Sequence, residues 1–336
     1  MRNSILLINL ASFVIIMTGL YFAKDIVIPF LLAIFLAVLI SPIITYMQKL
    51  KIPRAISLII VLLCFFGLFF IIGNVVAKNM TNFLTNLPDL QSKFMSFYSD
   101  LILKFSSFTD YISFNESLFS YINPNNIFLA TSGALKWSST LISKTFIVLL
   151  LFVFMIIETN IFKQKVIYFS NLNSQNKIMV DRFISDLKRY LAIKTISSLA
   201  TGVLVWIVLI YLNVPYAPIW GMVAFLLNYI PTIGSIIASI PAILIALLLN
   251  GYINALWVSI FYLVINISIG NFIEPKFLGD KLGLSTLVVI LSLIFWGFVL
   301  GIGGMFLAVP LTMSLKIAMD SNKKTKFISI LLSNKD

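Results

Sequence analysis

The sequence predicts an all-α polytopic membrane protein with broken or re-entrant helices in its C-terminal half. Of the 336 residues, 60% are hydrophobic and 11% are charged, whereas soluble domains average about 45–50% and 25%. The apolar runs are continuous and leave room for about six to nine spans of some 20 residues each. An outer-membrane barrel is excluded, because its strands alternate apolar and polar residues in segments of about ten.

Composition also limits the chemistry. The chain contains no histidine and one cysteine, Cys64, which excludes histidine bases, histidine-bound metals and disulfides within the chain. We expect Cys64 to be a small membrane-facing hydrophobe. No phosphate-binding glycine loop ending in Lys-Ser or Lys-Thr is present, and no nucleophile stands beside a base. We therefore expect neither an enzyme nor a bound cofactor or metal.

Residues 1–77 are expected to form three transmembrane helices, over 5–22, 26–47 and 55–77. The first is not a signal peptide, because a second span follows it directly. Lys24 and Asp25 are expected to form the short outer connection between them. Pro29 and Pro42 lie inside the second span, where neighbouring helices can satisfy the freed backbone groups. Three cations then mark the connection at 49–54.

Residues 78–136 differ from their surroundings, because their acidic and basic residues balance to zero. Apolar residues recur there at helical steps of three and four, which predicts an extramembrane or interfacial amphipathic helix; they are Leu90, Phe94, Phe97, Leu101 and Phe105. Residues 137–157 are expected to form the fourth transmembrane helix. Trp137 stands at its start, where aromatic rings prefer the membrane interface.

Residues 158–194 carry seven cations and three anions and are expected to form a cytoplasmic amphipathic helix segment. A C-terminal transmembrane transport core is expected over 195–320, followed by a basic cytoplasmic tail over 321–336. With the N-terminus inside, the inner segments hold nearly all of the net charge of +12, as the positive-inside rule requires. We therefore expect a multi-pass protein of the bacterial inner (cytoplasmic) membrane with both termini in the cytoplasm. Its basic groups are expected to face the lipid bilayer and no nucleic acid.

Two uncharged stretches are too long for one upright helix. The first, over 217–250, contains Pro231 and Pro241, and is expected to form two half-helices or a re-entrant hairpin. The second, over 284–315, is expected to be two helices meeting at a glycine-rich turn, or one long broken helix. Interrupted apolar segments indicate a transport site, although glycine and proline also occur where helices only pack closely. The break or packing residues expected in the second stretch are Gly297, Gly301, Gly304 and Pro310.

Glu274 is the acidic residue joined directly to an apolar run in this half of the chain. An ionisable group at membrane depth is a functional candidate. The alternative is an interfacial loop carboxylate neutralised by Lys276 or Lys281, since Pro275 favours a helix end there. The expected transport pathway is lined by polar groups and by the residues that shape the break, namely Asn228, Pro231, Thr232, Gly234, Ser235, Pro241, Asn266, Asn271 and Glu274.

Several of these segments resemble the autoinducer-2 exporter (AI-2E) family of bacterial transporters. The matching elements are Ile28 to Ala33 with Ser41-Pro42 and Ile52-Pro53-Arg54, Asn228 to Ala242, Glu274-Pro275-Lys276 with Gly279, and Phe295 to Leu311. The resemblance implies about seven or eight transmembrane helices and a polar insert between the third and fourth. It also implies assembly as homo-oligomers, expected to be pentamers. Ser235 departs from the proline that many members carry after the glycine at 234.

Three functions remain open at this point. The resemblance implies export of a small polar molecule, such as the quorum-sensing signal autoinducer-2, or exchange of sodium or lithium for protons. A scarcity of charge in the membrane favours the exporter, whereas an antiporter needs a carboxylate such as Glu274 or, less favourably, Asp25. The third reading is a membrane scaffold without transport. It would not need the broken helices, so replacing Pro231 or Gly234 by Ala should leave its function intact.

Overall fold

The computed structural model describes residues 2–106, 144–158, 174–231, 233–278, 284–320 and 325–333. Every regular element in these ranges is helical, and six helices are long and apolar enough to cross a membrane. The all-α polytopic prediction is therefore confirmed. In chain order the elements are α1 (Arg2–Phe22), α2 (Lys24–Lys49), α3 (Arg54–Thr85), α4 (Leu87–Ser106), a helix over 144–158, α7 (Ser174–Tyr211), α8 (Ala217–Leu227), α9 (Ile233–Asn250), α10 (Tyr252–Asn266), the π-helix η2 (Ile267–Ile273), α11 (Glu274–Leu278), α12 (Thr286–Asp320) and α13 (Lys326–Leu331).

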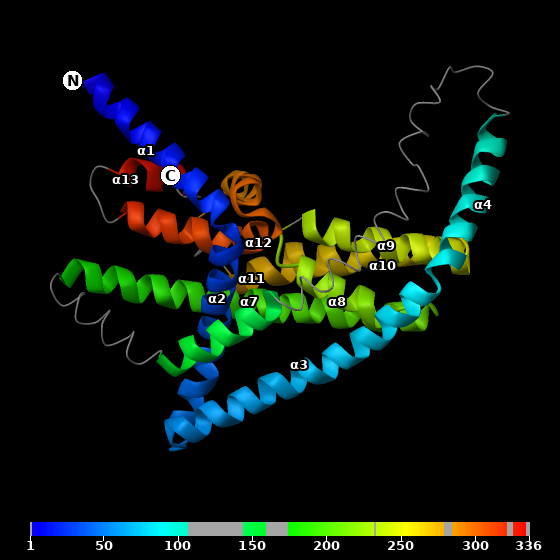
Figure 1. Cartoon of the computed structure of the whole chain (residues 1–336), viewed down its shortest axis with the longest axis horizontal. Helices are drawn as coiled ribbons and strands as arrows, with labels where there is room; N and C mark the ends of the chain where they lie inside the picture. Colours follow the sequence, from blue (N-terminus) through cyan, green and yellow to red (C-terminus); the bar gives the residue numbers. More distant parts are fainter. Residues whose placement is uncertain are drawn as a thin grey trace.

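Helices α7, α8, α9 and α10 lie side by side as an elongated bundle (Figure 1). Their buried apolar residues form one continuous core, which includes Leu209, Ala238 and Val258. The crossing of α7 and α8 depends on Gly202 and Gly221. A Cβ on either glycine would lie within 3 Å of the other residue's carbonyl oxygen, so the two backbones approach as closely as small residues permit.

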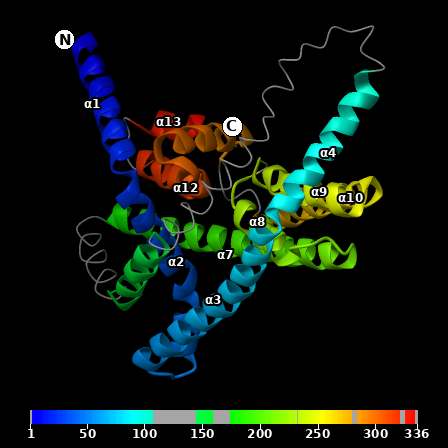
Figure 2. The ribbon, with the colours of Figure 1, turned by 45° about the vertical axis from the view of Figure 1, so that its right-hand side comes forward.

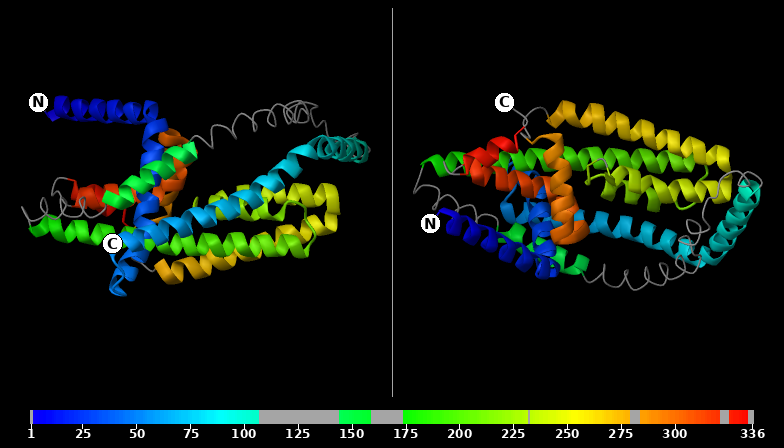
Figure 3. Two further views of the ribbon diagram at one scale, coloured as in Figure 1. Left: turned by 60° about the horizontal axis from the view of Figure 1, so that its bottom comes forward. Right: turned by 90° about the horizontal axis from the view of Figure 1, so that it is seen from above.

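Helix α2 crosses this bundle, and α1 and α12 pack beside it (Figures 1 and 2). Only Ala23 separates α1 from α2. The expected outer connection at 24–25 is wrong, because Lys24 and Asp25 are the first residues of α2. The two helices meet at an angle and do not fold back against each other as an antiparallel pair (Figure 3).

Helix α3 continues to Thr85, beyond the end predicted at Ala77. Asn86 then separates it from α4, which points away from the bundle (Figure 2). The predicted amphipathic helix therefore exists as α4 over Leu87–Ser106, while the first residues of the segment, 78–85, belong to α3. Residues 107–143, which hold the rest of the insert and Trp137, lie outside the described residues.

The helix over 144–158 belongs to the predicted fourth span and packs against α2 and α3 through Phe152 and Ile156. Its two ends are tied to other elements. The Lys144 ammonium lies 2.8 Å from the Asp25 carboxylate, and the Arg54 guanidinium donates to the carbonyl of Ile157 at 3.1 Å. The second contact satisfies a carbonyl that the end of a helix leaves without a partner.

Both uncharged stretches are interrupted, each in its own way. The first forms two helices, α8 and α9, separated by a break that begins at Asn228. Pro231 lies in this break, whereas Pro241 lies inside α9, so the expectation that Pro241 shapes the break is wrong. Gly234 is held so close to α8 that a Cβ there would lie 1.9 Å from the Leu227 carbonyl oxygen.

The second stretch, α12, consists of two helical arms that meet at Gly301. Its angles, φ 68° and ψ −153°, are accessible essentially to glycine alone. The Trp296 indole N–H donates to Thr312 Oγ1 at 3.0 Å, although a straight helix would separate these residues by about 24 Å. The arms therefore fold back on each other, as expected for two helices that meet at a glycine turn.

Candidate transport site

Polar side chains gather on one face of α7. Lys194, Ser197, Ser198 and Thr201 follow the i, i+3, i+4, i+7 spacing of a single helix face, and all four are buried. Helix α7 is continuous across this region, and its membrane-length part runs over Ile184–Tyr211. Helix α7 therefore joins the expected cytoplasmic segment to the expected fifth span without a break, and the boundary at 194/195 stays a prediction.

Glu274 lies against this face. The Lys194 ammonium is 2.6 Å from Glu274 Oε1, and Ser197 Oγ donates to the same oxygen at 2.7 Å. The two charged side chains are only 5% and 14% exposed. The partner of Glu274 is thus Lys194 and not Lys276, which is exposed. Glu274 also lies at the start of α11 and not in a loop. Lys281, the other partner considered, lies outside the described residues.

The position of Glu274 follows from η2, which ends directly before it. In a π-helix each hydrogen bond spans five residues instead of four, so a short π segment shifts the register of the helix that follows, and such segments are frequent at functional sites. Arg189 of α7 also donates to the Phe277 carbonyl at 2.9 Å. Helix α7 therefore holds the η2–α11 junction at two points, on either side of Pro275.

The break between α8 and α9 covers the other side of the polar face. Asn228 Nδ2 donates to Ser198 Oγ at 3.0 Å, and the Tyr229 hydroxyl donates to Thr195 Oγ1 at 2.8 Å. These groups are neutral, and each can both donate and accept hydrogen bonds. The α7 face therefore joins an uncharged polar half at the break to an ion pair at η2–α11. We call these seven residues the α7 polar cluster: Lys194, Thr195, Ser197, Ser198, Asn228, Tyr229 and Glu274.

An aromatic group adjoins the cluster at Tyr229. The Tyr229 ring stacks on Phe306 of α12, with 4.4 Å between centroids. Phe35 of α2 and Phe225 of α8 meet its edge, each at 5.7 Å. The cluster is therefore in contact with the second arm of α12 and with α2. A movement of either helix would shift the Tyr229 ring and its hydroxyl.

The charges of the cluster balance, and most of its groups are neutral hydrogen-bonding groups. Its one cation and one anion compensate each other, and the remaining groups are hydroxyls and an amide. Sites of this kind combine apolar walls with a few converging polar groups. Within the described ranges no three metal-ligating side chains come together.

The structure separates the predicted site residues into three groups. Asn228 and Glu274 meet at α7, while Pro231 and Gly234 shape the break beside them. Ser235 and Asn266 are half-buried on α9 and at the end of α10, and Asn271 is exposed in η2. Thr232 lies outside the described residues. The four residues expected at the second break, Gly297, Gly301, Gly304 and Pro310, all lie in α12.

Sequence reasoning missed the α7 residues of the cluster and Tyr229. Lys194 had been counted among the cytoplasmic cations because other basic residues precede it. The detectable signal was the helical spacing of Lys194, Ser197 and Ser198 within a stretch that is apolar on its other faces. Extending the fifth span toward its N-terminus would have placed this face in the membrane.

Comparisons with known proteins agree with this architecture. A family model described as the AI-2E family transporter matches residues 10–324. A Haemophilus influenzae protein whose name refers to transport is 40% identical over 98% of this chain and 96% of its own length. The AI-2 transport protein TqsA of Escherichia coli K12 is 36% identical over 98% and 95%, and YhhT of the same organism is 32% identical over 97% and 93%. The chain is therefore a membrane protein that belongs to the AI-2E transporter family.

Proposed function

We propose that this transporter exports a small polar molecule through the α7 polar cluster, and that autoinducer-2 is the molecule. The observation that carries the proposal is the convergence of Asn228, Ser198, Thr195 and Tyr229 at a broken helix. An interrupted helix at membrane depth is where transporters place their substrates. The name of TqsA, at 36% identity, supports the choice of autoinducer-2.

The ion pair favours a neutral solute over a charged one. Because Lys194 already compensates Glu274, a net charge brought to the cluster would have no counter-charge. A buried charge without a partner costs several kcal/mol. A neutral solute only has to replace the hydrogen bonds that Asn228 and Tyr229 make with α7.

Export is tested in a bacterial host that makes autoinducer-2 but lacks its own AI-2E proteins. We expect the wild-type chain to raise extracellular autoinducer-2 and lower the intracellular pool. Asn228→Ala should remove this effect, because it removes the amide that contacts Ser198. Asn79→Ala is the matched control, since the Asn79 amide bonds only to its own helix at Val75. Equal export by host cells with and without the chain would reject the substrate, and full activity of Asn228→Ala would reject the site.

A sodium or lithium/proton antiporter is the second proposal, favoured by one observation. Glu274 Oε1 and Ser197 Oγ lie 2.7 Å apart, and oxygen ligands of this kind suit hard cations. In this mechanism a cation replaces the Lys194 ammonium at the carboxylate. Liposomes that contain a pH-sensitive dye test it: added sodium or lithium should move protons with wild type and not with Glu274→Gln. Without proton movement in wild type, the antiporter is rejected.

A scaffold without transport is separated from the exporter by the export experiment and from the antiporter by the liposome experiment. We further propose an inner-membrane location with both termini in the cytoplasm, supported by the distribution of cations. We also propose assembly as a homo-oligomer, a pentamer as the family resemblance implies. Helix α3 offers a surface for such an assembly, because many of its apolar side chains are exposed in the described part of a single chain.

A further inference from the structure

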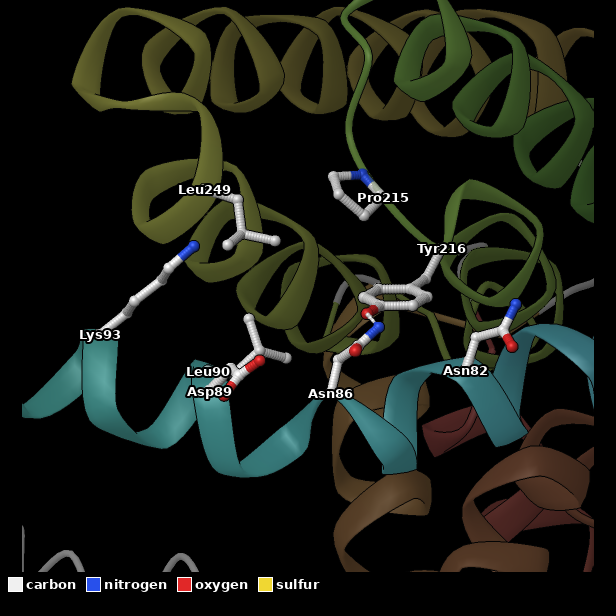
Figure 4. Close-up of a pocket in the computed structure, with 8 residues that line it drawn as sticks. All are labelled: Asn82, Asn86, Asp89, Leu90, Lys93, Pro215, Tyr216 and Leu249. Atoms are coloured by element: carbon white, nitrogen blue, oxygen red, sulfur yellow. Dashed lines mark hydrogen bonds between the residues drawn. The ribbon is translucent and has the colours of Figure 1, made fainter.

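An open pocket of about 460 Å³ lies away from the α7 polar cluster, at the far end of α7 (Figure 4). The junction of α3 and α4 forms one wall, and the α7–α8 connection and the end of α9 form the other. The end of α7 lies roughly 20 Å beyond Ser198, from a rise of about 1.5 Å per residue. The polar residues that line the pocket are Asn82, Asn86, Asp89, Lys93 and Tyr216.

The pocket lies where three membrane-length helices end together. Helix α3 ends at Thr85, α7 at Tyr211 and α9 at Asn250, and the pocket is lined from the residues next to all three ends. The amphipathic helix α4 leaves the bundle at the same place. Ends of spans and amphipathic helices both mark the boundary between hydrocarbon and headgroups, which favours a position near the lipid headgroups for the pocket.

The Tyr216 ring is fixed in place over the pocket. Its backbone has φ 61°, which is unusual for a bulky residue and persists only when the surroundings impose it. Asn86 Nδ2 donates to the Tyr216 hydroxyl at 3.0 Å, and the Phe83 ring meets the Tyr216 ring edge-on at 5.2 Å. The Asn250 amide also bonds the Asn213 carbonyl of the same connection at 3.1 Å. The aromatic face is therefore pre-organised.

The opposite wall offers one charge of each sign. Asp89 and Lys93 lie one turn apart on α4, a spacing that puts their Cβ atoms about 6 Å apart. Both line the pocket (Figure 4), and within the described part of the chain no ion pair joins them to each other or to another group. The amides of Asn82 and Asn86 continue the same face. A carboxylate, an ammonium and two amides suit a ligand that carries both charges.

We propose that this pocket binds a zwitterion that carries an ammonium and an anionic oxygen group a few bonds apart, namely the phosphoethanolamine headgroup of a membrane lipid. The ligand ammonium contacts the Asp89 carboxylate and the face of Tyr216, which attracts cations. The phosphate contacts the Lys93 ammonium, one turn along α4 from Asp89. Leu249 provides an apolar wall. A free amino acid has the same two groups, but the depth of the pocket favours the lipid.

Thermal unfolding of the purified full chain in detergent tests the proposal, with tryptophan fluorescence as the signal. The probes are short-chain phosphatidylethanolamine, phosphatidylcholine, phosphatidylglycerol and free glycine. We expect phosphatidylethanolamine to raise the unfolding midpoint temperature until the effect saturates. The ammonium of phosphatidylcholine has no N–H, so this lipid should need an about tenfold higher concentration for the same effect. Phosphatidylglycerol, which lacks the ammonium, should not act at this site.

Asp89→Asn and Lys93→Met should each weaken the phosphatidylethanolamine effect about tenfold. Asp100→Asn on α4 and Lys78→Met on α3 carry the same charge changes outside the pocket and should leave the effect unchanged. Saturable stabilisation by free glycine that depends on Asp89 would support the zwitterion site with a soluble source. Equal effects of all three lipids, or an unchanged effect in Asp89→Asn and Lys93→Met, would overturn the proposal.

Discussion

The Lys194 ammonium lies 2.6 Å from Glu274 Oε1, although 80 residues separate the two in the chain. Ser197 donates a second hydrogen bond to the same oxygen at 2.7 Å. The pair is buried between α7 and the η2–α11 junction, with side chains that are only 5% and 14% exposed. Its integrity therefore determines both the position of η2–α11 and the charge of the site.

Breaking this pair from one side should destabilise the protein strongly. Lys194→Met or Glu274→Gln leaves one buried charge without its partner, a change that costs about 3–5 kcal/mol. The double variant removes both charges and should recover much of the loss. Unfolding midpoints followed by tryptophan fluorescence measure the coupling in a double-mutant cycle.

Asp25→Asn is the matched control for this cycle. The Asp25–Lys144 pair has a similar distance, 2.8 Å, but its side chains are 70% and 48% exposed. Solvent screens an exposed pair and leaves it little net effect on stability, so this variant should unfold near the wild-type midpoint. If the stability losses of Lys194→Met and Glu274→Gln simply add up in the double variant, the two side chains are not coupled and the prediction is wrong.

Gly234→Ala should reduce the amount of folded protein in the membrane. The new Cβ would lie 1.9 Å from the Leu227 carbonyl oxygen, and neither backbone can yield without moving α8 against α9. Gly73→Ala on α3 is the control, because nothing lies within 4 Å of its added Cβ and alanine is the better helix former. Size-exclusion profiles of detergent extracts compare the two. A normal profile for Gly234→Ala would show that the break is not as tight as described.

The same clash changes how the scaffold alternative is tested. Replacing Gly234 by Ala was expected to leave a scaffold intact, but here the variant would fail for steric reasons whatever the function. Asn228→Ala, which removes side-chain atoms without adding any, is the more informative variant.

Gly301→Ala should open the hairpin of α12. Alanine at φ 68° and ψ −153° costs about 1–3 kcal/mol, and the strain is relieved if the arms separate. The reporter is a disulfide between Ser292→Cys and Thr312→Cys, whose hydroxyl oxygens are 2.8 Å apart in the native chain, in a Cys64→Ser background. We expect efficient oxidation with Gly301 and slower oxidation with Gly301→Ala. Unchanged oxidation would mean that the arms meet without help from Gly301.

The orientation of the chain is testable with single cysteines in the same Cys64→Ser background. If both termini are cytoplasmic, an impermeant maleimide should label Asp100→Cys on α4 in intact cells. It should label Lys326→Cys on α13 only after the membrane is permeabilised, and Lys326 is exposed in the structure. The reverse pattern would invert the proposed topology.

The sequence by itself determined the membrane class, the helical architecture and the two places where helices are interrupted. These properties depend on composition and on local backbone chemistry. Long uncharged runs require helices whose backbone groups bond internally, and Pro231 and Gly301 act on their own neighbours. Asn228 and Glu274 were found for the same local reason, since both are polar groups at the ends of apolar runs.

Tertiary structure alone decided which residues meet. Lys194 is one of seven cations in a basic segment, and no pattern in the sequence shows that Glu274 lies against it. The register set by η2 brings the Glu274 carboxylate to α7, and no local pattern shows that Pro241 stays helical while Pro231 does not. Pairing across 80 residues depends on how helices pack, which is a property of side-chain shape summed over the whole chain and not of any one segment.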